Sequence, residues 1–228
     1  MDLIRVSEKV WFAPYEEERD RPNLGYIRGE RWSLAVDAGH SDAHVEEFYA
    51  ALEKNGLPLP ALTVLTHWHW DHTFGQHRIH GLSVANAGTN SHLKRFKDRI
   101  AKDGAESFLS LDASIRKEYA GGRPVVIVPA EMEFEGELRL DAGKMPVRLF
   151  EAPSPHTDDS TLVFLPGEKI IFLGDAPCGE FPTWKQDREK TLQFIRTIEA
   201  IDASICISSH WLPQTKEELL AELRESIA

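Results

Sequence analysis

The chain has 228 residues, of which 42% are hydrophobic and 28% charged, and its formal net charge is −11. This length and composition predict a single domain over residues 1–228 with a sizeable core, and the chain has no apolar run long enough to span a membrane. The excess of negative charge argues against binding to nucleic acid or to an anionic membrane surface.

The first half of the chain alternates short apolar runs with turns. The runs 25–29 and 32–36 are typical of strands. Apolar residues at i, i+3, i+4 and i+7 predict a helix over 42–55, which the following Gly-Leu-Pro ends. Residues 61–66 predict a buried strand that leads directly into a histidine-rich segment.

The second half begins with a polar segment of helical pattern, and we expect a helical insertion at about 91–120. After the break at 121–124, the pattern changes to short apolar runs. These runs predict strands over 125–128, 147–150, 161–165 and 170–173, with a hairpin turn at 166–168. A helix over 187–200, which would bury Leu192, Ile195 and Ile198, a strand over 204–208 and a C-terminal helix complete the pattern. A strand-plus-helix arrangement in each half predicts two packed sheets with helices outside.

Ligand-type side chains crowd the segment that follows the strand at 61–66, which reads Thr-His-Trp-His-Trp-Asp-His. In an extended segment His67 and His69 point to the same side. Asp71 and His72 follow the expected turn and can face the same pocket from another direction. A rigid strand followed by a loop is a common way to hold a metal ion, so this density of donors predicts a metal site rather than an ordinary polar turn.

Three further candidate ligands lie farther along the chain. His156 stands in the loop before a predicted strand, and Asp175 and His210 each follow one. Taken singly, each has an ordinary explanation as a loop or capping residue. Taken together with the histidine-rich segment, they provide enough nitrogen and oxygen donors for two ions.

The string His67-x-His69-x-Asp71-His72, followed by His156, Asp175 and His210, resembles the metallo-β-lactamase superfamily, and the resemblance runs from Asp37 to His210. It implies an α+β fold, an αββα sandwich of two packed mixed β-sheets flanked by helices, with the site at one edge of the sheets. It also implies ligand roles. His67, His69 and His156 would hold one ion, Asp71, His72 and His210 the other, Asp175 would bridge them, and Asp37 would support the loop.

The resemblance implies a metal-dependent hydrolase with two divalent ions. Zinc fits the nitrogen and oxygen donors best, and iron or manganese would also suit them. A bridging hydroxide would attack a small ester, thioester, lactone or amide, and Asp71 is the candidate catalytic residue that orients it or relays its proton. Two alternatives stay open. One is an iron-dependent oxidoreductase of the same fold acting on oxygen, sulfur or nitric oxide, and the other is a binding module with a purely structural metal.

Several residues around the candidate ligands carry weaker expectations. Thr157 and Asp159 could hydrogen-bond the ligand imidazoles. Trp184, with Phe181 beside it, is the candidate substrate-contacting aromatic residue. Trp68 and Trp70 alternate with the ligands and should face away from them, while His40, His44, His77, His80 and His92 are expected at the surface or behind the ligands.

The two cysteines, Cys178 and Cys206, are too few for a disulfide framework. Their number fits a reducing compartment. The N-terminal residues show no basic start followed by a long apolar run, so we expect no signal peptide and a cytoplasmic location.

Overall fold

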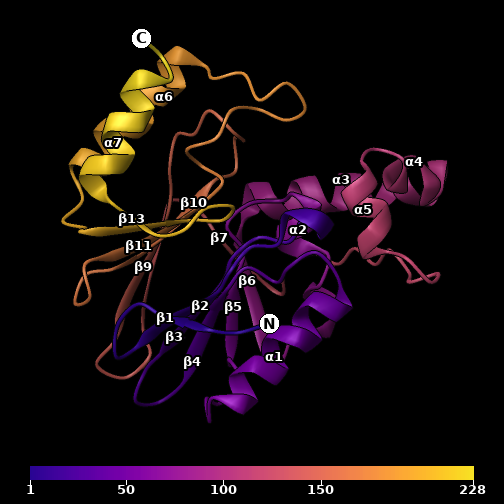
Figure 1. Ribbon diagram of the computed structural model, residues 1–228, viewed down its shortest axis with the longest axis horizontal. Coiled ribbons are helices and arrows are strands. Elements are labelled where there is room, and N and C mark those ends of the chain that lie inside the picture. Colours follow the sequence, from indigo (N-terminus) through magenta and orange to yellow (C-terminus); the bar gives the residue numbers. More distant parts are fainter.

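Two mixed β-sheets pack face to face in the computed structural model, which describes all 228 residues, and helices cover their outer faces (Figure 1). This is the αββα sandwich that the sequence predicts. The first sheet has its seven strands in chain order, antiparallel from β1 to β4 and parallel from β4 to β7. Its strands are β1 (Ile4–Arg5), β2 (Val10–Ala13), β3 (Leu24–Arg28), β4 (Ser33–Val36), β5 (Leu62–Val64), β6 (Leu82–Asn86) and β7 (Met132–Phe134).

The second sheet has six strands in the order β13-β12-β11-β10-β9-β8. Only β11 and β12 run parallel, and the other neighbours are antiparallel. Its strands are β8 (Glu137–Asp141), β9 (Pro146–Glu151), β10 (Thr161–Leu165), β11 (Ile170–Gly174), β12 (Ile205–Ser208) and β13 (Gln214–Thr215). The expected hairpin joins β10 to β11, with Leu165 paired to Ile170.

The helices divide between the two outer faces. Figure 1 shows α6 and α7 over the second sheet, and α1 together with the group α3 to α5 on the side of the first sheet. The helices are α1 (Asp42–Lys54), α2 (Trp70–Thr73), α3 (Ala87–Asp103), α4 (Glu106–Leu109), α5 (Ala113–Glu118), α6 (Arg188–Glu199) and α7 (Lys216–Glu225), with 3₁₀ turns η1 (Glu17–Arg19) and η2 (Gln76–Arg78). None of them is both long enough and apolar enough to cross a bilayer.

The core has a layer between the sheets and a further layer under each set of helices. Strand β10 shows how the sequence builds both sides. Val163 and Leu165 belong to the cluster between the sheets, whereas Leu162 and Phe164 belong to the cluster under α6 and α7. Because successive side chains of a strand point to opposite faces, a continuous apolar run is required wherever both faces are covered.

The predicted strand at 125–128 is wrong, since this segment belongs to no strand or helix. It lies between Pro124 and Pro129, which lack the backbone N–H that a sheet ladder needs. Two of its apolar side chains, Val125 and Ile127, instead pack on the aromatic cluster of the helical layer. In α6 the buried apolar residues are Phe194, Ile195 and Ile198, while the predicted Leu192 is only half-buried.

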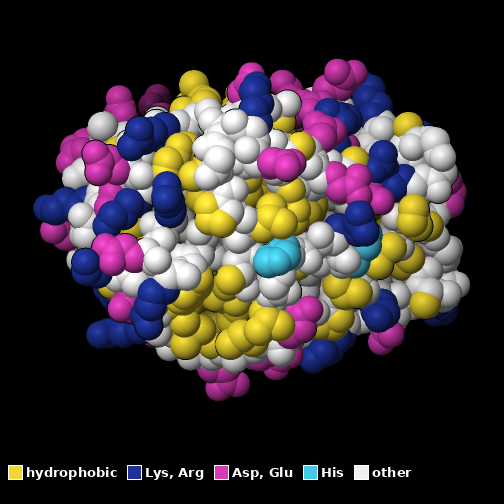
Figure 2. Space-filling model, turned by 90° about the horizontal axis from the view of Figure 1, so that it is seen from below, with side chains coloured by type: hydrophobic (Ala, Val, Ile, Leu, Met, Phe, Trp, Pro, Cys, Tyr) yellow, Lys and Arg dark blue, Asp and Glu magenta, His cyan; other side chains and the backbone are white.

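Charged side chains of both signs are interspersed over the face seen in Figure 2. Lysine and arginine groups alternate there with aspartate and glutamate groups around the margin. This face therefore presents no continuous basic surface of the kind that follows a phosphate backbone.

Candidate metal centre

All seven candidate ligands converge at one edge of the sandwich, where β5, β11 and β12 end. His67 follows β5, and His69 precedes α2, which carries Asp71 and His72. The other three come from the second sheet. Asp175 follows β11, His210 follows β12, and His156 lies in the loop between β9 and β10.

The ligand atoms form two groups, and within each group they lie within 4.8 Å of one another. The first group is His67, His69 and His156, and the second is Asp71, His72, Asp175 and His210. Asp175 stands between the groups. Its Oδ2 lies 3.6 Å from His72 Nε2 and 3.7 Å from His156 Nε2, which belong to different groups. A carboxylate at this position can reach two ions at once.

Several of the buried polar atoms in these groups have no hydrogen-bond partner. They are His67 Nε2, His72 Nε2 and Asp175 Oδ1. A buried polar group without a partner costs about 1–3 kcal/mol, so such atoms are rare unless a ligand completes them. Three of them directed at one cluster fit the binding of cations there.

The charges of the second group also favour a bound cation. Burial disfavours a charged imidazole, but the carboxylates of Asp71, Asp37 and Asp175 outweigh it and raise the pKa of His72 well above its usual range. Burial is also outweighed at His210, whose pKa Asp175 and Asp71 raise to about 10. The carboxylates therefore make the electrostatic potential of this group negative, and bound divalent cations would neutralise it.

The first group is different, because it contains only imidazoles. Burial lowers the pKa of His67 well below its usual range, and burial together with the nearby His156 lowers that of His69 to about 3. Both imidazoles are therefore neutral at pH 7. A neutral imidazole offers the nitrogen lone pair that a transition metal binds.

Asp37 positions the ligands from behind. Its carboxylate accepts hydrogen bonds from the backbone N–H of Thr66 at 2.7 Å and from Nδ1 of His72 at 2.8 Å. The second bond fixes the tautomer of His72, so that Nε2 faces the cluster. Asp37 adopts a left-handed backbone with φ of 66°. This supporting role is the one that the resemblance implies.

Thr157 and Asp159 were predicted to hydrogen-bond the ligand imidazoles, and this prediction is wrong. Thr157 bonds Ser160 at 3.1 Å, and Asp159 accepts from Thr89 at 2.8 Å. Nδ1 of His156 instead meets a backbone carbonyl, that of Gly179, at 2.7 Å. Sequence spacing gave no signal of a backbone partner more than twenty residues away.

A cavity of about 510 Å³ opens onto the candidate ligands. Four ligand residues line it, together with aromatic and acidic side chains from other segments. Its lining is Glu17, Asp20, His69, Trp70, Asp71, Asp112, Ser114, Asp175, Cys178, Phe181, Trp184, His210 and Trp211. Trp184 and Phe181 were expected there. Glu17, Asp20 and Asp112 were not, because they belong to no motif and reach the cavity from η1, its following turn and the start of α5.

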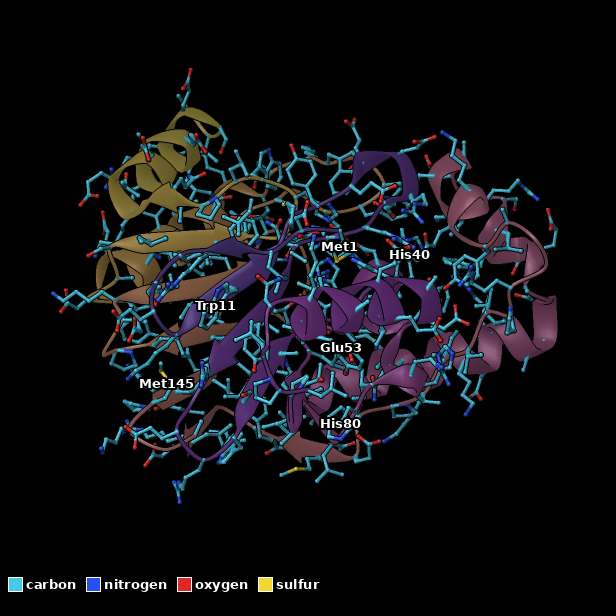
Figure 3. All side chains as sticks on the ribbon, turned by 60° about the horizontal axis from the view of Figure 1, so that its bottom comes forward. Met1, Trp11, His40, Glu53, His80 and Met145 are labelled. Carbon is cyan, nitrogen blue, oxygen red and sulfur yellow. The ribbon has the colours of Figure 1, made fainter.

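Trp70, His40 and His44 all lie in the interior of the protein. Trp70 packs in the core as expected but also lines the cavity, and its Nε1 donates to Asp20 Oδ2 at 2.9 Å. His40 and His44, which were expected either at the surface or behind the ligands, are fully buried. Figure 3 shows His40 at the N-terminal end of α1, on the side of the α4–α5 helices. Its carbonyl accepts a hydrogen bond from the Tyr119 hydroxyl at 2.7 Å.

Comparisons with known proteins agree with this fold. A model of the metallo-beta-lactamase superfamily matches residues 19–210. The metallo-beta-lactamase from Pontibacter korlensis superposes with a TM-score of 0.72 at 17% identity, over 99% of this chain and 98% of that one. The sec-alkylsulfatase Pisa1 from Pseudomonas sp. superposes with a TM-score of 0.77 at 15% identity, over 99% of this chain but 41% of that one. At these identities the two structures establish the fold alone.

A curated relative is similar in sequence. It is an atrochrysone carboxyl ACP thioesterase from Aspergillus fumigatus, 24% identical over 180 residues. The match covers 78% of this chain and 46% of the relative, so the chain spans about half the length of this relative.

Proposed function

The chain belongs to the metallo-β-lactamase superfamily, and on that basis we propose that it is a hydrolase in which two divalent metal ions act on a small ester, thioester, lactone or amide. The observation that carries the proposal is the place of Asp175, whose Oδ2 lies within 3.7 Å of imidazoles from both ligand groups. The name of the curated relative supports a thioester among the candidate substrates.

We assign one ion to His67, His69 and His156, the other to Asp71, His72 and His210, and the bridge to Asp175. Bound divalent cations would supply Lewis acidity, which polarises a carbonyl oxygen and brings the pKa of water toward neutrality. Nitrogen and oxygen donors favour zinc, with iron or manganese as alternatives. Cys178 lies near His156 and Asp175, but burial raises the pKa of its thiol well above the usual range, so it is a poor competitor as a ligand.

The chain's own side chains have separable tasks in this proposal. Asp71 lines the cavity, and its Oδ2 lies 3.1 Å from His210 Nε2. A carboxylate there can orient the attacking water or take its proton. Trp70, Phe181 and Trp184 wall the same cavity with apolar surface, which reduces the access of bulk water to the reacting groups.

Metal analysis combined with a substrate screen tests the proposal. Wild type, Asp175→Ala and the control Asp202→Ala would be loaded with zinc, desalted and measured for metal content. They would then be assayed on uncharged esters, thioesters, lactones and amides. Asp202 is an exposed aspartate paired only with Lys169, so its loss should change neither reading.

We expect about two ions per wild-type chain, as a two-metal site requires. In Asp175→Ala we expect the loss of at least one ion and a fall in kcat/KM of at least about 100-fold, the upper range for removal of groups that merely support ligands. Fewer than one ion per loaded wild-type chain together with no turnover would refute the proposal. Iron in the purified protein with oxygen or sulfur chemistry would favour the oxidoreductase alternative.

A further inference from the structure

A second cavity of about 380 Å³ adjoins the one that opens onto the ligands. The two share Cys178, Trp184 and Trp211 as walls. The second cavity continues from these residues to the inner side of α7, where Leu219 and Leu223 line it. A molecule that reacts at the candidate metal centre can therefore extend past the tryptophans into a largely apolar space.

Neither cavity is lined by lysine or arginine. Beyond the candidate ligands, the first is bordered by Glu17, Asp20 and Asp112, and the second by Glu222. Lys185 follows Trp184 in the chain but lies outside both linings. Away from the candidate metal centre, an anionic substituent in either cavity would lose water without gaining a cationic side chain and would face carboxylates instead, which is unfavourable.

Two residues of the wall between the cavities, Trp184 and Trp211, lie outside the buried core. Trp184 and Trp211 are 57% and 51% exposed, unlike the buried aromatic residues of the helical layer. The Trp184 ring stacks on His156 with ring centres 6.0 Å apart. Its backbone is left-handed, with φ of 55°, a strained conformation for a bulky side chain. Such strain is concentrated at binding sites, where it places a side chain for recognition.

We propose that the substrate is an uncharged or cationic acyl compound whose apolar arm lies in the cavity under α7, between Trp184, Trp211 and Leu223. This inference rests on the proposed hydrolase function and narrows its substrate class. The scissile carbonyl sits at the candidate metal centre, and the arm passes the shared tryptophan wall. Each methylene of the arm that enters the cavity leaves water for apolar contacts.

A series of 4-nitrophenyl acyl esters, from acetate to octanoate, tests the arm. For wild type we expect kcat/KM to rise by about fourfold per methylene while the chain still fits, as complete burial of a methylene predicts. The variant Ser226→Phe places a ring at the exposed mouth of the cavity, and Ala221→Phe places one elsewhere on α7. We expect the octanoate-to-acetate ratio to fall at least tenfold in Ser226→Phe and to stay at the wild-type value in Ala221→Phe.

A second comparison tests the charge. Acyl esters of equal length would end in a methyl, a carboxylate or a trimethylammonium group. We expect the carboxylate ester to be at least tenfold poorer than the other two. Glu222→Lys should narrow that difference at least fivefold, whereas Glu225→Lys should not, because Glu225 is exposed on the same helix but lies outside the cavity lining.

Calorimetric titration of wild type and Ser226→Phe with 1-octanol measures the apolar cavity without turnover. Binding to wild type that is weakened in Ser226→Phe is the expected result. If acetate is hydrolysed but chain length has no effect, or if the carboxylate ester is preferred, this inference is wrong and the hydrolase proposal stands. If no ester, thioester, lactone or amide is hydrolysed by the metal-loaded protein, the hydrolase proposal itself fails.

Discussion

Replacing Glu118 by Gln would leave the guanidinium of Arg21 buried without its main counter-charge. Both side chains are almost fully buried, and they form two hydrogen bonds of 2.8 and 2.9 Å. The pair joins the end of α5 to the segment that carries Glu17 and Asp20, which border the cavity of the candidate metal centre. The Ser41 hydroxyl, at the start of α1, also donates to Glu118.

The loss of one partner from a buried ion pair destabilises a protein by about 3–5 kcal/mol. Glu47 lies 3.0 Å from Arg21, but its side chain is 41% exposed, so it compensates the charge only in part. We therefore expect a loss near the lower limit, about 3 kcal/mol. For a chain of this size, this corresponds to a fall in Tm of about 6–12 °C.

Urea and thermal unfolding of the metal-loaded protein would measure the effect. The control is Glu199→Gln, which breaks an exposed pair with Arg224 of 2.6 Å and should cost less than about 1 kcal/mol. The double variant Arg21→Met with Glu118→Met should recover most of the loss, since no charge is then buried. If Glu118→Gln were no more destabilising than Glu199→Gln, the reasoning from burial would be refuted.

Three further predictions concern the surroundings of the candidate ligands and the core. Asp37→Asn keeps a side chain that tolerates positive φ but removes the charge facing His72, so zinc affinity measured against a chelating dye should fall about 10–100-fold, and an unchanged affinity would contradict the supporting role. Gly174→Ala should destabilise the protein by about 2–3 kcal/mol in urea unfolding, because φ is +57° and a Cβ would lie 2.6 Å from Thr66 Oγ1; a cost below about 0.5 kcal/mol would show that the strand ends relax. Burial raises the pKa of the Cys206 thiol to about 12, so in a Cys178→Ala background a thiol reagent at pH 8 should react at least about 100-fold faster in urea than in buffer, and equal rates would contradict its burial.

Local sequence determined several helices and strands of this protein and the position of its histidine-rich motif. Helix α1 follows from apolar residues at helical spacing and from the Ser41 side chain, which accepts a hydrogen bond from the His44 backbone at its start. Strands β10 and β11 follow from short apolar runs on either side of a turn. The motif from His67 to His72 was recognisable because its donors are close neighbours in the chain. In each case a few adjacent residues determine the outcome through the two- and 3.6-residue periods of the backbone.

Tertiary structure decided what stands around that motif. Asp175 and His210 lie side by side because β11 and β12 pair in parallel, and both lie close to the motif, as does His156, because the second sheet packs on the first. The segment 125–128 had the pattern of a strand, but flanking prolines and the aromatic cluster of the helical layer placed it elsewhere. The acidic border of the cavity comes from η1 and α5, which carry no common motif. Contacts between segments far apart in the chain depend on the packing of the entire core, and no local period of the sequence encodes that packing.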